Sequence, residues 1–174
     1  MIKKGLSIFL IFISFQLIGQ SINKTIIDPQ LNKSVMIGYC NKAGFETGEF
    51  GEVFKAEFDK YKPKKKYIER LTPVINQVEF TIVLGTWCGD SKEQVPRFYK
   101  ILMECGYSDK KVKAIGVDRN KSAILVDTKE FNIERVPTFI VYKNGMEIGR
   151  IIETPEKRIE RDLWNIISVN TLPK

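Results

Sequence analysis

The apolar positions in the second half of the chain alternate between short continuous runs and stretches with helical spacing. The run Phe80–Leu84 is typical of a central strand that is covered on both faces. The amphipathic segment after it has apolar residues three and four positions apart, which predicts a helix. The pattern predicts strands at Phe80–Leu84, Lys113–Val117, Phe139–Tyr142 and Glu147–Ile151, and helices at Lys92–Cys105, Lys129–Phe131 and Glu156–Ile167. This order of strands and helices predicts an α/β fold.

The sequence before residue 79 has a different pattern. Ser34–Ile37 predicts a short strand, and apolar residues at helical spacing from Phe50 to Tyr61 predict a helix with one buried face. Another helix is predicted over residues 64–76, with its last turns distorted by Pro73. These elements form an N-terminal strand and helix extension.

The chain divides into three predicted regions, namely residues 1–20, 21–78 and 79–174. In the first region two lysines precede the apolar stretch Leu6–Ile18, which is typical of a secretory signal peptide. This stretch is too short for a stable membrane span, which needs about 20 residues. We therefore expect export to the bacterial periplasm, with an uncleaved N-terminal membrane tether as the alternative. The second region is the extension, and it is expected to pack on the core formed by the third.

Composition narrows the possible chemistry. The 174-residue chain has a net charge of +7, and part of the excess is gathered between Lys60 and Lys66, where we expect a solvated loop and the start of a helix. Nucleic-acid binding requires basic residues interleaved with exposed aromatic residues, so it is not expected. The chain has three cysteines and no histidine. The lack of histidine excludes Cys–His pairs, Ser–His–Asp triads and histidine-ligated metal sites, and we expect neither a metal nor a cofactor.

The most informative motif is Thr86–Ser91, which places Cys88 between a predicted strand and a predicted helix. Unpaired N–H groups and the positive end of the helix dipole favour an anion at this position. The thiolate is the reactive form of cysteine, so Cys88 is a candidate nucleophile. A second motif, Arg135–Thr138, leads into a predicted strand and the turn Lys143–Gly145.

From about Phe80 to Ile167 the chain resembles the thioredoxin superfamily. Trp87–Gly89 followed by Pro96 is similar to the start of the active-site helix in that family, and Val136–Thr138 is similar to its cis-proline segment. The resemblance implies a thioredoxin-like fold with a central mixed sheet flanked by helices. It also implies thiol–disulfide chemistry.

The resemblance assigns a role to each motif. Cys88 is implied to be the attacking nucleophile, with its sulfur partly exposed. Pro137 is implied to be a cis residue packed against Cys88, which turns the Val136 backbone toward a bound extended polypeptide. Trp87 is implied to flank the groove. The residues implied in substrate binding are Trp87, Gly89, Asp90, Val136, Pro137 and Thr138.

Two positions depart from the family pattern. Ser91 stands where a resolving cysteine usually lies, and its hydroxyl can hydrogen-bond Cys88 but cannot close a disulfide. Release of a mixed disulfide then needs the second thiol of the client or a thiol elsewhere. Ile82 stands six residues before Cys88, where many thioredoxins bury a carboxylate. Asp90 either substitutes for that carboxylate in part or serves only the helix N-terminus.

The two remaining cysteines differ as candidate resolving thiols. Cys105 lies far along the same predicted helix, on the order of 25 Å from Cys88. A disulfide requires Cα atoms within about 7 Å, so Cys105 is excluded within one molecule. Cys40 lies in an irregular segment, and a Cys40–Cys88 disulfide is therefore a hypothesis.

These observations predict an exported monothiol oxidoreductase, isomerase-like or capturing clients as mixed disulfides through Cys88. Its partners are expected to be thiols and disulfides of exported proteins, together with an unidentified redox partner. The alternative is a redox-inactive thioredoxin-fold module that holds extended segments in the Pro137 groove. A peroxide- or glutathione-dependent monothiol enzyme is a third possibility, and the lack of a second thiol beside Cys88 weighs against it.

Overall fold

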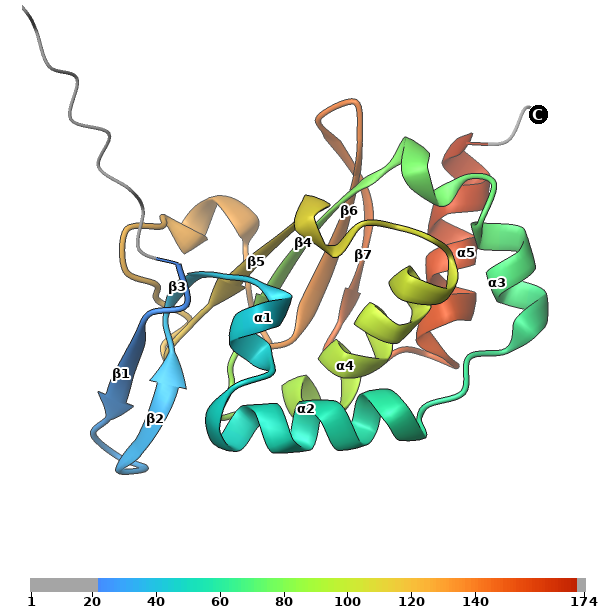
Figure 1. Ribbon diagram of the computed structural model, residues 1–174. Coiled ribbons are helices and arrows are strands. Elements are labelled where there is room, and N and C mark those ends of the chain that lie inside the picture. Colours follow the sequence, from blue (N-terminus) through green and yellow to red (C-terminus); the bar gives the residue numbers. More distant parts are fainter. Residues whose placement is uncertain (1–21, 172–174) are drawn as a thin grey trace, which may run out of the picture.

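A five-stranded mixed sheet forms the centre of the computed structural model, which describes residues 22–171 (Figure 1). The predicted leader, residues 1–20, lies outside the described residues. The strands follow the order β3 (Gly38–Cys40), β5 (Val112–Gly116), β4 (Glu79–Leu84), β6 (Thr138–Lys143) and β7 (Met146–Ile152). Only β4 and β5 pair in parallel, and the other neighbours are antiparallel. The predicted α/β fold with a mixed sheet is confirmed.

Helices cover one face of this sheet, and β4 shows why. Its Phe80, Ile82 and Leu84 point into a large apolar cluster on the helical side, whereas Val83 points into a smaller cluster on the opposite face. Such alternation places successive side chains on opposite faces, as the pleat of a strand requires. The helices are α2 (Gly48–Lys60), α4 (Gly89–Glu104) and α5 (Ile159–Thr171), with α3 (Lys65–Leu71) packed on α5 (Figure 1).

The opposite face is covered by the connection between β5 and β6. This connection contains the short helix η3 (Thr128–Phe131), and its Val117, Phe131 and Val136 are buried against Ile115 and Ile140 of the sheet. The connection ends beside the start of α4, so this face of the sheet leads directly to Cys88.

The N-terminal extension contributes a strand to the sheet, which the sequence pattern did not predict. A hairpin of β1 (Thr25–Asp28) and β2 (Lys33–Met36) precedes β3, and the short helix α1 (Lys42–Phe45) follows it. The edge strand β3 pairs with β5 in the register Gly38 to Gly116. The Met36 N–H donates a hydrogen bond to the Thr86 hydroxyl over 3.0 Å, which fixes the hairpin to the segment before Cys88.

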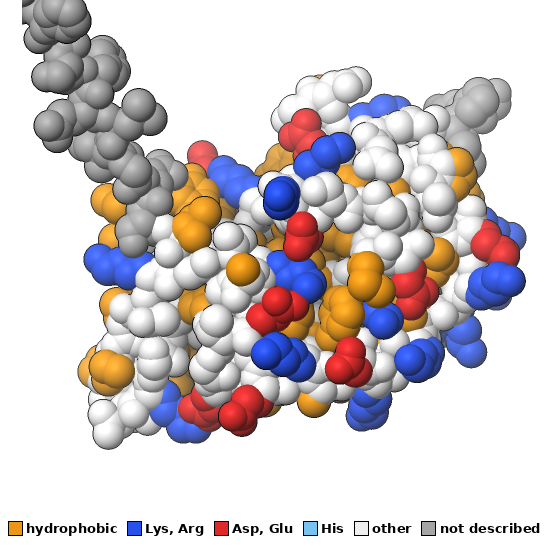
Figure 2. Space-filling model, viewed as in Figure 1, with side chains coloured by type: hydrophobic (Ala, Val, Ile, Leu, Met, Phe, Trp, Pro, Cys, Tyr) orange, Lys and Arg blue, Asp and Glu red, His pale blue; other side chains and the backbone are white. Residues whose placement is uncertain are grey.

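A buried carboxylate joins the extension to the last helix. Glu160 is fully buried, and it accepts hydrogen bonds from the Tyr61 hydroxyl (2.6 Å), the Lys64 N–H (2.9 Å) and the Arg158 Nε (2.6 Å). Burial raises the pKa of this carboxyl, and these hydrogen bonds outweigh burial and hold the pKa below its ordinary value. The lysines of the neighbouring segment, between Lys60 and Lys66, are exposed. Figure 2 shows that Lys and Arg side chains are spread over this side of the surface.

Two predicted helices differ from those in the structure. The helix predicted over residues 64–76 ends at Leu71 and is followed by the short helix η1 (Ile75–Gln77), because Pro73 has no N–H to continue the ladder. The last helix begins at Ile159 rather than at Glu156, since its first backbone hydrogen bonds end on the carbonyl of Arg158. Within residues 22–171 no helix is long and apolar enough to cross a membrane.

Candidate thiol active site

The chain passes from β4 into α4 (Figure 1), and Cys88 is the N-cap residue of that helix. Its backbone is extended, with φ −81° and ψ 134°, and its carbonyl accepts the first helical hydrogen bond from the Lys92 N–H over 3.1 Å. The side chain is half-buried, and its sulfur donates a hydrogen bond to the Val136 carbonyl over 3.2 Å. Gly89, the next residue, is exposed. The sulfur is therefore placed at a helix start with one side open.

Trp87 is held firmly beside this cysteine. Its Nε1 donates a hydrogen bond to the Val117 carbonyl over 2.9 Å, and the Arg119 guanidinium lies 5.8 Å from the ring centroid. The ring also covers Gly85 so closely that a Cβ added there would come within 2.5 Å of it. Trp87 is half-buried and so presents part of its ring at the surface.

The second motif lies against Cys88. The Val136–Pro137 peptide bond is cis, and Val136, Pro137 and Thr138 are all buried. The Thr138 hydroxyl donates a hydrogen bond to the Arg135 carbonyl over 2.7 Å, which closes the turn before β6. The structure thus brings the two predicted motifs together, although 48 residues separate Cys88 from Val136.

Glu153 also belongs to this site, and no sequence signal indicated it. Its φ of 61° lies in the left-handed region, which is uncommon for residues other than glycine. Its N–H donates a hydrogen bond to the Pro137 carbonyl over 2.6 Å, and its carboxylate pairs with Arg135 over 2.7 Å. Glu153 therefore braces the turn that contacts Cys88.

Ser91 does not form the predicted hydrogen bond to Cys88. Its side chain is fully buried, and its hydroxyl accepts a hydrogen bond from the Gly85 N–H over 3.3 Å. The hydroxyl is therefore used to hold the end of β4 against the first turn of α4. Asp90 is half-buried in the same first turn, where a carboxylate is favourable.

The structure does not bring Cys40 to Cys88, which corrects the hypothesis of a disulfide between them. All three cysteines are described, and each is a free thiol. Cys40 points into the apolar cluster on the helical side of the sheet, whereas Cys88 packs on the opposite face. Burial raises the pKa of Cys40 to about 11, and it does the same for Cys105 at the end of α4.

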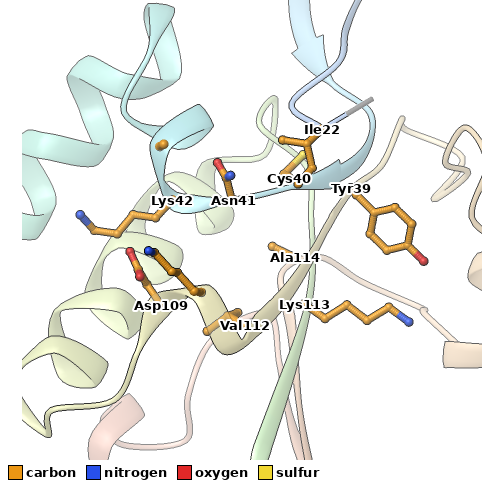
Figure 3. Close-up of a pocket in the computed structure, with 11 residues that line it drawn as sticks. Ile22, Tyr39, Cys40, Asn41, Lys42, Asp109, Val112, Lys113 and Ala114 are labelled. Atoms are coloured by element: carbon orange, nitrogen blue, oxygen red, sulfur yellow. The ribbon is translucent and has the colours of Figure 1, made fainter. Parts of the chain in front are cut away.

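Cys40 also lines a hollow of about 450 Å³ beside the paired strands β3 and β5 and the start of α1 (Figure 3). Lys42 and Asp109 lie toward one end of this hollow, and Tyr39 and Lys113 lie toward the other (Figure 3). Apart from Cys40, its lining includes none of the residues predicted for thiol chemistry. This hollow is therefore separate from the thiol site.

Comparison with known proteins agrees with this geometry. The family model described as Thioredoxin matches residues 65–165, more than half of the chain. The chain belongs to the thioredoxin family. This thioredoxin-family protein is 32% identical over 90 residues to Thioredoxin 1 of Plasmodium falciparum, a match that covers 51% of this chain and 81% of that protein. It is 28% identical over 82 residues to the mitochondrial Thioredoxin-3 of Saccharomyces cerevisiae, covering 47% and 60% respectively.

A solved structure shares the fold of this chain. A protein of unknown function from Pseudomonas aeruginosa superposes with a TM-score of 0.53 at 14% identity, covering 76% of this chain and 92% of the other. At a coarse level, membership of the thioredoxin family indicates a role like that of a thiol–disulfide oxidoreductase. In this thioredoxin-family protein the residues available for that role are Cys88 and its neighbours.

Proposed function

We propose that this thioredoxin-family protein carries out thiol–disulfide exchange on protein clients with Cys88 as its single reacting thiol. The observation that supports this most directly is the placement of a half-buried cysteine on the N-cap of α4, with its sulfur against the Val136 backbone. Of the three thiols, Cys40 and Cys105 are buried, and only Cys88 reaches the surface.

The exchange begins when Cys88 loses its proton to solvent. The thiolate attacks one sulfur of a client disulfide, a new S–S bond forms to Cys88, and the other client sulfur leaves as a thiolate. The Val136 N–H has no hydrogen-bond partner among residues 22–171, so it is free to bind a client carbonyl. An extended client segment would then lie beside Pro137.

The side chain of residue 91 determines which thiol resolves the mixed disulfide between Cys88 and the client. The Ser91 hydroxyl is buried and bonded to Gly85, and it cannot replace a thiol as the attacking group. The released client thiolate, or a thiol from a redox partner, must therefore attack the mixed disulfide. The first route rearranges client disulfides without net oxidation or reduction, as an isomerase does.

The proposed clients are exported proteins of the bacterial periplasm. This part of the proposal rests on the charge and hydropathy pattern of residues 1–20. Disulfides persist in oxidising compartments, which gives an exported exchanger its clients. Fractionation of cells that express the full chain tests this address, and recovery with the membrane fraction would favour the N-terminal tether instead.

A binding module without redox activity is the second candidate function. The hydrogen bond from the Cys88 sulfur to the Val136 carbonyl favours it, because this bond keeps the sulfur turned toward the protein. In that case the free Val136 N–H and the Pro137 turn would hold extended segments without covalent chemistry.

Covalent trapping separates the two functions. The purified protein and its Cys88→Ala variant are incubated with a disulfide-bonded peptide, quenched with acid and examined by non-reducing mass spectrometry. An adduct on Cys88 that is lost in the variant supports exchange. Equal peptide binding by both proteins without any adduct would refute exchange and support the binding module. A Cys105→Ala variant is the matched control, because that thiol is buried and must leave the adduct unchanged.

A further inference from the structure

The N-terminal hairpin forms one wall of a second hollow, which lies beside Trp87. This hollow has a volume of about 180 Å³ and lies between the hairpin and the first turns of α2 and α4. Its apolar lining includes Val35 of β2 and Phe50 of α2, which are 2% and 7% exposed, and the side of Trp87. Leu31, in the turn of the hairpin, stands at its edge and is 37% exposed. The hollow therefore offers apolar surface to a side chain from outside.

Charged side chains surround the mouth of this hollow. Lys33 of β2 pairs with Glu49 in the first turn of α2 over 2.6 Å, which joins the hairpin to that helix. Lys92 of α4 also lines the hollow, and its positive charge helps to lower the pKa of the Glu49 carboxyl. Two cations thus face one carboxylate, and a positive charge remains at the mouth.

The hollow adjoins the thiol site through Trp87, although Cys88 itself does not line it. Trp87 lines it and directly precedes Cys88, and the Lys92 N–H donates a hydrogen bond to the Cys88 carbonyl over 3.1 Å. The backbone of Lys92, one of the lining residues, therefore lies about one helical turn, roughly 5 Å, from the reacting cysteine along α4. An extended chain advances about 3.3 Å per residue, so a client held at Cys88 reaches the hollow with its second residue.

We propose that this hollow is a client subsite, which takes one apolar side chain close to the client cysteine and favours an acidic residue next to it. The subsite rests on the proposed exchange at Cys88. Its occupant is a segment of the client, because Trp87 both lines the hollow and directly precedes Cys88, to which the client is bound. The extension of this chain, rather than the sheet, then selects the clients.

The test uses synthetic peptides whose single cysteine is activated as a mixed disulfide with thionitrobenzoate. Attack by Cys88 releases the coloured thiolate, so the absorbance gives the second-order rate constant for each peptide. The peptides carry Leu or Ser two residues from the cysteine, each flanked by Glu or Lys. We expect Leu to be favoured over Ser by about 10-fold, as for a side chain that fills an apolar pocket. We also expect Glu to be favoured over Lys.

Two variants and a matched control identify the hollow as the source of these preferences. Leu31→Ser should abolish the preference for Leu, and Lys92→Glu should reverse the preference between Glu and Lys. Ile27→Ser is the control, because Ile27 lies on the same hairpin and is 62% exposed but does not line the hollow. Leu31→Ser and Ile27→Ser should react like the parent protein with free cysteine activated in the same way. For Lys92→Glu, whose new charge lies near the Cys88 thiolate, each peptide rate is divided by the rate of the same variant with activated cysteine.

The outcomes keep the two proposals apart. Equal rates for Leu and Ser peptides in the parent protein would overturn the subsite while leaving exchange at Cys88 intact. A preference for Leu that survives in Leu31→Ser, or that is lost equally in Ile27→Ser, would also overturn it. If neither the peptides nor activated cysteine react at Cys88, the proposed exchange fails and the subsite fails with it.

Discussion

Replacing Ser91 with cysteine should convert this monothiol site into one that releases its own clients. In the parent protein a peptide joined to Cys88 waits for a thiol from outside the site. In the Ser91→Cys variant the introduced thiol lies three residues further along α4 and attacks the Cys88 sulfur from within the molecule. The peptide then leaves as a thiol, and a disulfide remains between the two positions.

The position of residue 91 gives the size of the gain in release rate and of the loss in stability. Residues three apart at a helix start have Cβ atoms about 5–6 Å apart, so small adjustments suffice to reach disulfide geometry. A thiol linked so closely acts at an effective concentration of millimolar or more. Against a competing thiol at about 1 μM, release should be faster by about a thousandfold. Loss of the hydrogen bond from the Gly85 N–H to Ser91 costs about 1–3 kcal/mol, which a domain of ordinary stability tolerates.

The assay follows release of a labelled peptide from its purified mixed disulfide with Cys88, with a small thiol present at about 1 μM. Acid quenching and non-reducing mass spectrometry give the fraction released at each time. Ser91→Ala is the matched control, because it removes the same hydrogen bond and adds no thiol, and it should release peptide as slowly as the parent protein. A folded Ser91→Cys variant that releases peptide no faster than Ser91→Ala would refute the placement of residue 91 within reach of the Cys88 sulfur.

Further predictions concern stability, measured by urea unfolding. Glu160→Gln should lower the free energy of unfolding by about 3 kcal/mol, since it disrupts a buried ion pair, whereas Glu69→Gln, at an exposed pair, should cost less than about 1 kcal/mol. Burial raises the pKa of the Cys40 and Cys105 thiols to about 11 in the folded protein, from about 9 in the unfolded chain. The contribution of these two thiols to the free energy of unfolding is therefore complete below pH 9 and is lost between pH 9 and 11. A free energy of unfolding that does not change over this pH range would contradict their burial. Gly85→Ala should destabilise the protein by about 1–3 kcal/mol, because the added Cβ meets the neighbouring indole; an unchanged midpoint would contradict that packing.

The central strands and the active-site helix could be predicted because their signals are local. Phe80–Leu84 is apolar enough to be recognised as a covered strand, and the structure places β4 there. The edge strand β3 has only three residues, and its partner β5 lies more than 70 positions away in the chain. No short window of sequence contains such a pairing, so its existence could not be predicted in this way.

The site was predictable to a similar extent. The two motifs identify Cys88 and Val136, and the structure brings them into contact. The position of Cys40 depended on a strand that was not predicted, because the pleat of β3 decides which face its side chain meets. Glu153 braces the turn beside Cys88 through its backbone conformation and its ion pair with Arg135. Neither of these can be predicted from a glutamate at this position in the sequence.

The edge strand β3 has a consequence for any shortened form of this protein. A fragment cut to the span of the family model, residues 65–165, would retain β5 but lose the strand that covers its outer side. The N–H and C=O groups of Val112–Gly116 would then be open to strands of other molecules, and open apolar edges of this kind promote fibrous or amorphous aggregation. The N-terminal extension therefore protects the edge of β5 from pairing with other molecules, and soluble expression requires a form of the protein that retains β3.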